Sequence, residues 1–118
     1  MIKDIEFFIK NKIFTEKYLL KKRLKRSILN NYELELNFLD QFKNKKKDAI
    51  DIGVYRGVYS YKLSKLFNHI YSFEPNPLLY PYLKKNLTQI IRNITLSNYA
   101  LSNNDGDTDL RIPNRSSS

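Results

Sequence analysis

The spacing of hydrophobic positions changes near residue 48 of this chain. Before that point, apolar residues recur at helical spacing, at Ile13, Leu20, Leu24 and Ile28. The basic residues between them predict an amphipathic helix that begins near Glu16, with Thr15 as its N-cap. A second helix is predicted over residues 32–42, with its apolar residues on one stripe, at Leu34, Phe38 and Phe42.

From residue 48 onward, short apolar runs alternate with helical patterns. The runs predict strands over residues 49–52, 70–73 and 94–98, the first of them buried, and the patterns between them predict helices over residues 57–67 and 76–87. The inward residues expected of the first helix are Val58, Tyr61 and Leu66. The second helix has Asn76 as its N-cap, and Pro81 should loosen its first turn. The polar cluster at residues 103–106 predicts a turn, and residues 108–112 a fourth, antiparallel strand.

This order of elements predicts an α/β fold. Right-handed crossovers place the three parallel strands in the order 3-2-1, which is half of a doubly wound sheet, with the fourth strand as a hairpin arm. We therefore expect a basic helical segment over residues 1–47 and a partial ligand-binding domain over residues 48–118.

Composition narrows the possible classes of site. The 118 residues include no cysteine and one histidine, so disulfides and cysteine or histidine metal clusters are excluded. His69 is expected to cap a helix or lie on the surface. No apolar run approaches the about 20 residues that cross a bilayer, and the N-terminus is a poor signal peptide. A cytoplasmic protein without a transmembrane segment is the expectation.

The net charge of +9 is concentrated at the N-terminus. Residues 1–47 hold thirteen Lys and Arg against six Asp and Glu, and the remaining residues hold eight against six. One functional interpretation of this excess is attraction to nucleic acid, an anionic membrane or an acidic polymer, although nucleic acid is not the favoured partner. The alternative is coding bias, because Lys, Asn and Ile are abundant throughout.

The most informative candidate for chemistry lies where the first predicted strand ends. Asp51-Ile52-Gly53 is followed by Gly57, in the pattern D-x-G-x-x-x-G. Gly53 permits a tight turn close to a ligand, and Gly57 opens a helix whose N–H groups favour an anionic group. The alternative is a strand–helix turn that uses glycine for geometry alone.

Polar residues also follow the other two parallel strands. Glu74 lies 23 residues after Asp51 and can accept both hydroxyls of a ribose. The amide of Asn98 and the backbone up to Ala100 can meet the edge of a purine. Singly, Glu74 is equally explained as a charge at the start of a helix, and Asn98 as a strand exit. Together they predict a nucleotide site, because the C-terminal ends of parallel strands meet at one edge.

The glycine pattern bears on which nucleotide binds. A dinucleotide fold prefers G-x-G-x-x-G, whose three glycines admit a pyrophosphate. This chain has two glycines spaced G-x-x-x-G, which favours a ligand with an amino-acid tail, S-adenosylmethionine.

Residues 48–112 resemble the N-terminal half of the FkbM-type family of class I S-adenosylmethionine-dependent methyltransferases. That family has a strand ending in D-x-G-A-N-x-G, an F-E-P-N-P segment and an n-x-A-L-S segment before a D-G turn. The matching segments here begin at Asp51, Phe73 and Asn98, with Asp105-Gly106 as the turn. The resemblance implies a Rossmann-like fold, truncated here to its first three strands, and O-methylation of a small molecule or glycan.

The resemblance also implies roles for individual residues. Gly53 would hold the methionine part of the cofactor, with Asp51 near its ammonium group. Glu74 would bind the ribose, Pro75 would pack on the adenine, and residues 98–100 would line its edge. The family's Ala-Asn pair is Val54-Tyr55 here, so the contacts around Tyr55 should differ. No residue is assigned as the catalytic base.

In the topology of the resembled family, a fourth parallel strand lies beside the first one. None of the strands predicted here corresponds to it. The strand at residues 49–52 would then be an exposed apolar edge. We expect the 118-residue chain to be the cofactor-binding half of a longer enzyme, inactive alone and prone to self-association. The alternatives are an RNA or DNA methyltransferase that uses the basic helices, and a non-catalytic Rossmann-like module whose basic amphipathic helix docks on a membrane or partner.

Overall fold

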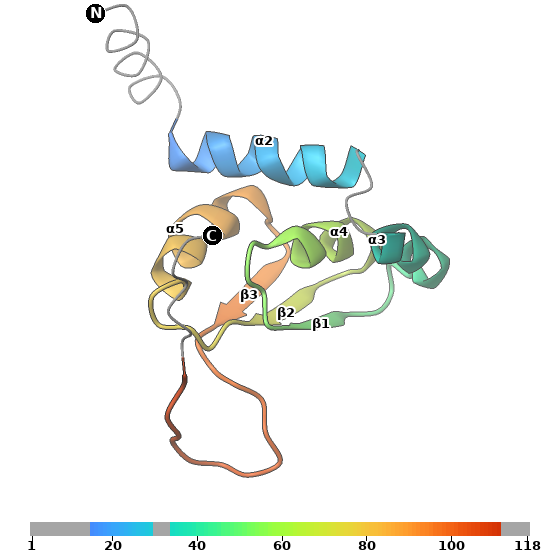
Figure 1. The fold of residues 1–118 in the computed structure, drawn as a ribbon. Coiled ribbons are helices and arrows are strands. Elements are labelled where there is room, and N and C mark those ends of the chain that lie inside the picture. The colour runs from blue at the N-terminus through green and yellow to red at the C-terminus, as the bar shows by residue number, and fades with distance from the viewer. Residues whose placement is uncertain (1–14, 30–33, 112–118) are drawn as a thin grey trace, which may run out of the picture.

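A computed structural model of the chain describes residues 15–29 and 34–111 (Figure 1). Helices and strands alternate after residue 48, as the hydrophobic pattern predicts. The elements in chain order are α2 (Glu16–Leu29), α3 (Leu34–Phe38), the 3₁₀ helix η1 (Leu39–Phe42), β1 (Ala49–Ile52), α4 (Val58–Leu66), β2 (Ile70–Phe73), α5 (Tyr80–Ile90) and β3 (Ile94–Ser97).

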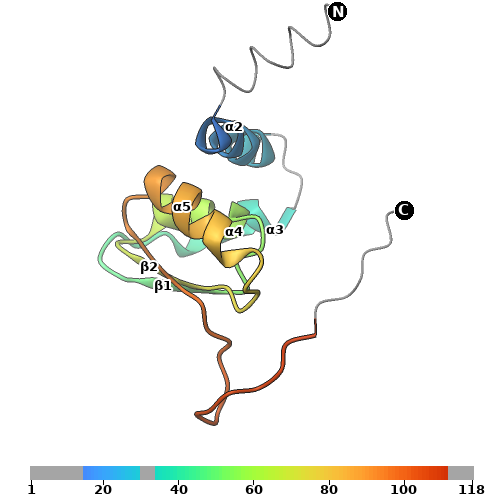
Figure 2. The same ribbon diagram turned by 90° about the vertical axis from the view of Figure 1, so that its left-hand side faces the viewer.

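The three strands form one parallel sheet in the order β1-β2-β3, which confirms the predicted order 3-2-1. Ala49 pairs with Ile70, and Ile70 pairs with Ile94. Both crossovers carry their helix to the same face of the sheet, so α4 and α5 lie side by side on it (Figures 1 and 2). The structure is therefore an α/β fold with helices on one face.

The core lies between this sheet face and the helices. Helix α2 crosses the outer side of α4 and α5 (Figure 1), and its Leu20 and Leu24 are buried in the same cluster as the other core residues. That cluster also contains Val54, Tyr61, Leu83, Leu87, Ile91 and Leu96. The N-cap prediction for α2 is confirmed, since the Tyr18 N–H donates to Thr15 Oγ1 over 3.2 Å.

The strand at residues 49–52 forms as predicted, but the expectation that it is buried is wrong. Ile50 is 61% exposed and Ile52 is 67% exposed, and Tyr71 on β2 is also exposed. These side chains point away from α4 and α5, because alternate residues of a strand face opposite sides of the sheet. Among the described residues no element covers this second face (Figure 2).

The helix predicted over residues 32–42 is divided in the structure into a short α-helix and a 3₁₀ helix. Its described part is α3 followed by η1, and residues 32 and 33 lie outside the described residues. The three residues of the predicted stripe, Leu34, Phe38 and Phe42, are all exposed, and Leu36 is the buried residue of α3. Leu34 and Phe38 lie one helical turn apart in α3 and share its exposed side, and the ring centres of Phe38 and Phe42 lie 5.4 Å apart.

Helix α5 begins and ends later than predicted. Residues 77–79 form a turn, in which Asn76 Oδ1 accepts the Leu78 N–H over 2.9 Å. The prediction of Asn76 as the N-cap of the helix is wrong, because the N-cap of α5 is Leu79. Pro81 lies in the first turn of α5, where the N–H that it lacks would not pair within the helix. Strand β3 ends at Ser97, one residue before the predicted Asn98.

The predicted hairpin arm over residues 108–112 is wrong for residues 108–111, which form no strand, and residue 112 lies outside the described residues. The segment after β3 leads away from the sheet as a long loop (Figure 1). Leu110 is exposed and lies between Asp109 and Arg111, so the segment has little apolar surface to bury.

Candidate functional site

The turn between β1 and α4 is built on three residues with positive φ. Gly53 has φ 79°, Tyr55 has φ 55° and Gly57 has φ 88°. Gly57 is the N-cap of α4, and a Cβ there would lie 2.8 Å from Leu87 Cδ1. The predicted tight turn at Gly53 and the predicted helix start at Gly57 are confirmed, and Gly57 also permits close packing of α4 against α5.

Glu74 links this turn to the end of β2. Its Oε1 accepts the Tyr55 N–H over 2.8 Å, and its Oε2 accepts the Asn76 N–H over 2.9 Å. The side chain is 6% exposed. The backbone N–H of residue 55 therefore ties the β1–α4 turn to the end of β2.

The backbone of Glu74 also connects to β3. Its N–H donates to the Ser97 carbonyl over 2.9 Å, and its carbonyl accepts from Asn98 Nδ2 over 2.8 Å. Since the Gly53 N–H donates to the Phe73 carbonyl over 2.8 Å, the ends of all three strands are joined around Glu74. The structure thus brings Gly53, Glu74 and Asn98 to one edge of the sheet.

Asp51 lies on the helix-covered face, beneath the first turn of α4. The Ser60 hydroxyl lies 2.5 Å from Asp51 Oδ2 and 2.8 Å from the Ser72 hydroxyl. Burial raises the pKa of the Asp51 carboxyl above its ordinary value of 3.8. Hydrogen bonds from the side chain and backbone of Ser60 lower this pKa, and the charge of Glu74 raises it further.

Two hollows adjoin this edge of the sheet. The first, here called the Asn98 hollow, has a volume of about 470 Å³ and contains three predicted site residues, Pro75, Asn98 and Ala100. The loop after β3 forms its other side, with Tyr99, Ser102, Asn104, Asp105, Gly106, Asp107, Thr108 and Leu110.

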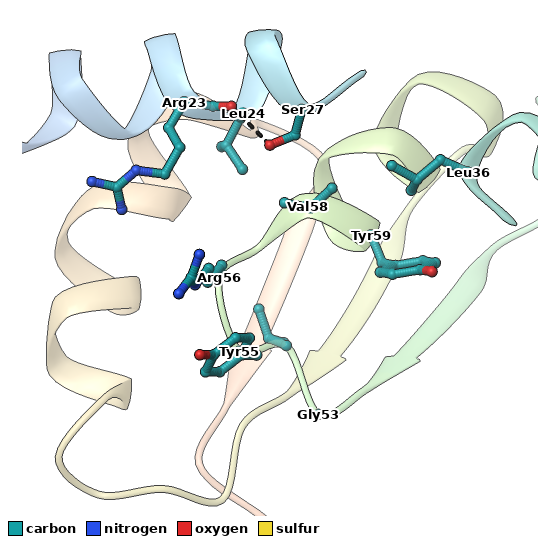
Figure 3. Close-up of a pocket in the computed structure, with 10 residues that line it drawn as sticks. Arg23, Leu24, Ser27, Leu36, Gly53, Tyr55, Arg56, Val58 and Tyr59 are labelled. Atoms are coloured by element: carbon teal, nitrogen blue, oxygen red, sulfur yellow. Dashed lines mark hydrogen bonds between the residues drawn. The ribbon is translucent and has the colours of Figure 1, made fainter. Parts of the chain in front are cut away.

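The second, here called the Arg56 hollow, has a volume of about 410 Å³ and lies between α2, α3 and the β1–α4 turn (Figure 3). Of the predicted site residues, only Gly53 lines it. Asp51, Gly57 and Glu74 line neither hollow and support the turn between them. Sequence reasoning missed the Arg56 hollow because Arg23 and Leu36 lie far from Gly53 in the chain and carry no motif.

Other kinds of site have little support in the described part of the chain. It contains no group of three or more His, Cys, Asp or Glu side chains that could hold a metal ion. His69 lies before β2, at the opposite end of that strand from Glu74, and its Nε2 is 2.7 Å from Thr95 Oγ1. No helix within residues 15–29 and 34–111 has the length and apolar character needed to cross a membrane.

Comparison with known proteins adds no assignment. No family model matches the chain, and no curated protein shows significant similarity to it.

Proposed function

We propose that this chain is the cofactor-binding half of an S-adenosylmethionine-dependent methyltransferase acting on an oxygen of a small molecule or glycan. The observation that carries the proposal is the junction at Glu74, where the ends of three parallel strands meet beside the Asn98 hollow. Open parallel sheets bind nucleotides at this edge.

The residues at the junction fit the cofactor in charge and in hydrogen-bonding capacity. Asp51 and Glu74 place two carboxyl groups near the β1–α4 turn, which suits a ligand with a sulfonium and an ammonium group. A carboxylate offers about four acceptor sites, and two backbone N–H groups occupy two of those on Glu74. In this proposal the ribose hydroxyls would meet the remaining acceptor sites of this buried carboxylate.

The Asn98 hollow suits the adenine. Pro75 supplies an apolar surface and Asn98 lies beside it, with Ala100 leaving space. The bound cofactor would supply an activated methyl group, and the residues of this chain would hold and orient it. No described side chain is assigned as the base, so in this proposal the chain contributes binding and position.

Calorimetric titration with S-adenosylmethionine tests the proposal. Ala100→Trp should abolish or strongly weaken binding by filling the Asn98 hollow, whereas Asn103→Trp, on the same loop but outside the hollow lining, should not. Glu74→Ala should weaken binding by about 1–3 kcal/mol through lost hydrogen bonds to a charged group. Equal affinity of all three variants and the unmodified chain, or no binding by the unmodified chain, would exclude this site.

One observation favours a second candidate, a nucleic-acid methyltransferase. The basic side chains of α2 are exposed, while Leu20 and Leu24 are buried in the core. These leucines are therefore not available for insertion into a membrane, which weakens the membrane-docking alternative.

This second candidate predicts RNA or DNA binding that falls steeply with salt. Reversing the charge of the exposed basic residues of α2 should remove this binding. These residues are Lys21, Lys22, Arg23, Lys25 and Arg26. Salt-independent or absent binding would leave the small-molecule function as the better proposal.

A further inference from the structure

The Arg56 hollow is assembled from three separate segments. Helix α2 contributes Arg23, Leu24 and Ser27, helix α3 contributes Leu36, and the remaining lining comes from residues 53–56, 58 and 59. Its volume of about 410 Å³ lies in the range of small-molecule sites. It is therefore large enough to accept a compact organic molecule.

The lining combines apolar walls with two positive charges. Leucine, valine and tyrosine side chains form most of it, and it includes Arg23 and Arg56 but no acidic residue. In Figure 3 both guanidinium groups lie on the same side of the hollow. The Arg56 guanidinium lies 5.2 Å from the centre of the Tyr55 ring, which holds it beside the turn.

Neither arginine is neutralised within the described residues. The ion pair found there joins Lys62 to Asp40 over 2.8 Å, and neither of those residues lines the hollow. The hydroxyl of Ser27 donates to the Arg23 carbonyl over 3.0 Å, so it leaves the guanidinium unaffected. An anionic group entering the hollow would thus meet two cationic side chains without a competing carboxylate.

From this lining we infer that the Arg56 hollow binds a small organic anion with an aromatic or aliphatic body. The anionic group contacts Arg23 and Arg56, and the body packs on the apolar walls. S-adenosylmethionine is a poor match, since its sulfonium would lie near two positive charges. A polyanion would gain little from apolar walls.

This binding inference stands independently of the proposed function. If the proposed function also holds, the hollow shares Gly53 and Tyr55 with the cofactor-binding turn, and the anion is then the methyl acceptor. That assignment rests on the proposed function, whereas binding of the anion itself does not.

Two fluorescent probes with the same aromatic body test the inference without cofactor. The anionic probe is 1-anilinonaphthalene-8-sulfonate, and the neutral one is N-phenyl-1-naphthylamine. Arg23→Gln and Arg56→Gln should each weaken the binding of the sulfonate probe about two- to fivefold, the range for exposed charge pairs. Both variants should bind the neutral probe with unchanged affinity. Added salt should weaken the binding of the sulfonate probe only.

Matched variants separate charge from folding and from other surfaces. Arg26→Gln removes an α2 charge outside the hollow and should have little effect, and Arg23→Lys and Arg56→Lys should restore most of the sulfonate affinity. Ile50→Ser reduces the exposed apolar surface of the uncovered sheet face, which is the other apolar surface on which the probes could bind. The inference is overturned if Ile50→Ser abolishes sulfonate binding, or if the two Gln variants behave like Arg26→Gln. If the unmodified chain does not bind S-adenosylmethionine in a separate titration, that result counts against the proposed function and leaves the anion-binding inference standing.

Discussion

Tyr55 and Glu74 depend on each other at the scale of single residues. A non-glycine residue in the left-handed region costs on the order of 1 kcal/mol, and Tyr55 has φ 55°. The hydrogen bond from its N–H to the buried Glu74 carboxylate offsets this strain. Glu74 therefore orders the turn whether or not it also binds a ribose, and its substitution should affect folding as well as ligand binding.

Asp51 provides a test that depends on pH. Its pKa is raised in the folded chain, so the folded state binds more protons than the unfolded state between pH 3.8 and the folded pKa. The stability contribution of Asp51 is complete below pH 3.8 and is lost as pH rises through the folded pKa.

Asp51→Asn removes this dependence. Relative to the variant, the unmodified chain should therefore lose stability as pH rises from 3 towards neutrality, as measured by urea denaturation at several pH values. A difference that is flat with pH, or that changes in the unmodified chain's favour, would show that burial does not control this carboxyl group.

At the scale of elements, the β1–α4 turn and the α4–α5 contact meet at Gly57. Gly53 and Gly57 share a positive φ, but only at Gly57 does an added Cβ meet another atom, at Leu87. Leu87 is fully buried in the core, so it has little room to move aside.

The two glycines form a matched pair of test sites. Gly53→Ala should lower the free energy of unfolding by about 1 kcal/mol through backbone strain alone, and Gly57→Ala by about 2–3 kcal/mol through strain plus overpacking. Chemical denaturation measures both. Equal losses would mean that Leu87 adapts at no cost.

The elements that sequence predicted well are those with strong local signals. The strands at residues 49–52 and 70–73 and the helix after Gly57 have clear periods and glycine or polar boundaries. The wrong strand at 108–111 lacks such signals, and so does the burial of Leu36 between the exposed Leu34 and Phe38. In both segments, packing partners decide the outcome, and Leu36 is buried because it faces the rest of the chain, not because of its spacing.

At the scale of the whole molecule, residues 15–29 and 34–111 cover one face of the sheet and leave the other uncovered. The N–H groups of Ala49 and Gly53 point to β2, so in a parallel ladder the peptide groups of Ile50 and Ile52 point to the opposite edge. Their exposed side chains add an apolar surface to that edge. Such an edge favours pairing with another chain, while the net charge of +9 opposes it.

Self-association through β1 is the corresponding prediction. The average mass measured by light scattering should rise with protein concentration, and rise more at high salt, because salt screens the repulsion. Ile52→Lys should reduce the association, while Leu78→Lys, at an exposed site away from the strands, should not. A monomer at all concentrations and salt levels would contradict the prediction.

The sequence by itself determined the order of the elements, the parallel strand order and the turn at Gly53 and Gly57, because these follow from local periodicity, turn chemistry and crossover handedness. It also predicted which polar residues, among them Glu74 and Asn98, lie at the strand ends. Only the tertiary structure decided that backbone N–H groups occupy two acceptor sites of the Glu74 carboxylate. It alone decided that the described residues leave one sheet face uncovered, and that Arg23 and Arg56 line the same hollow. These features arise from contacts between distant segments, for which no local pattern exists.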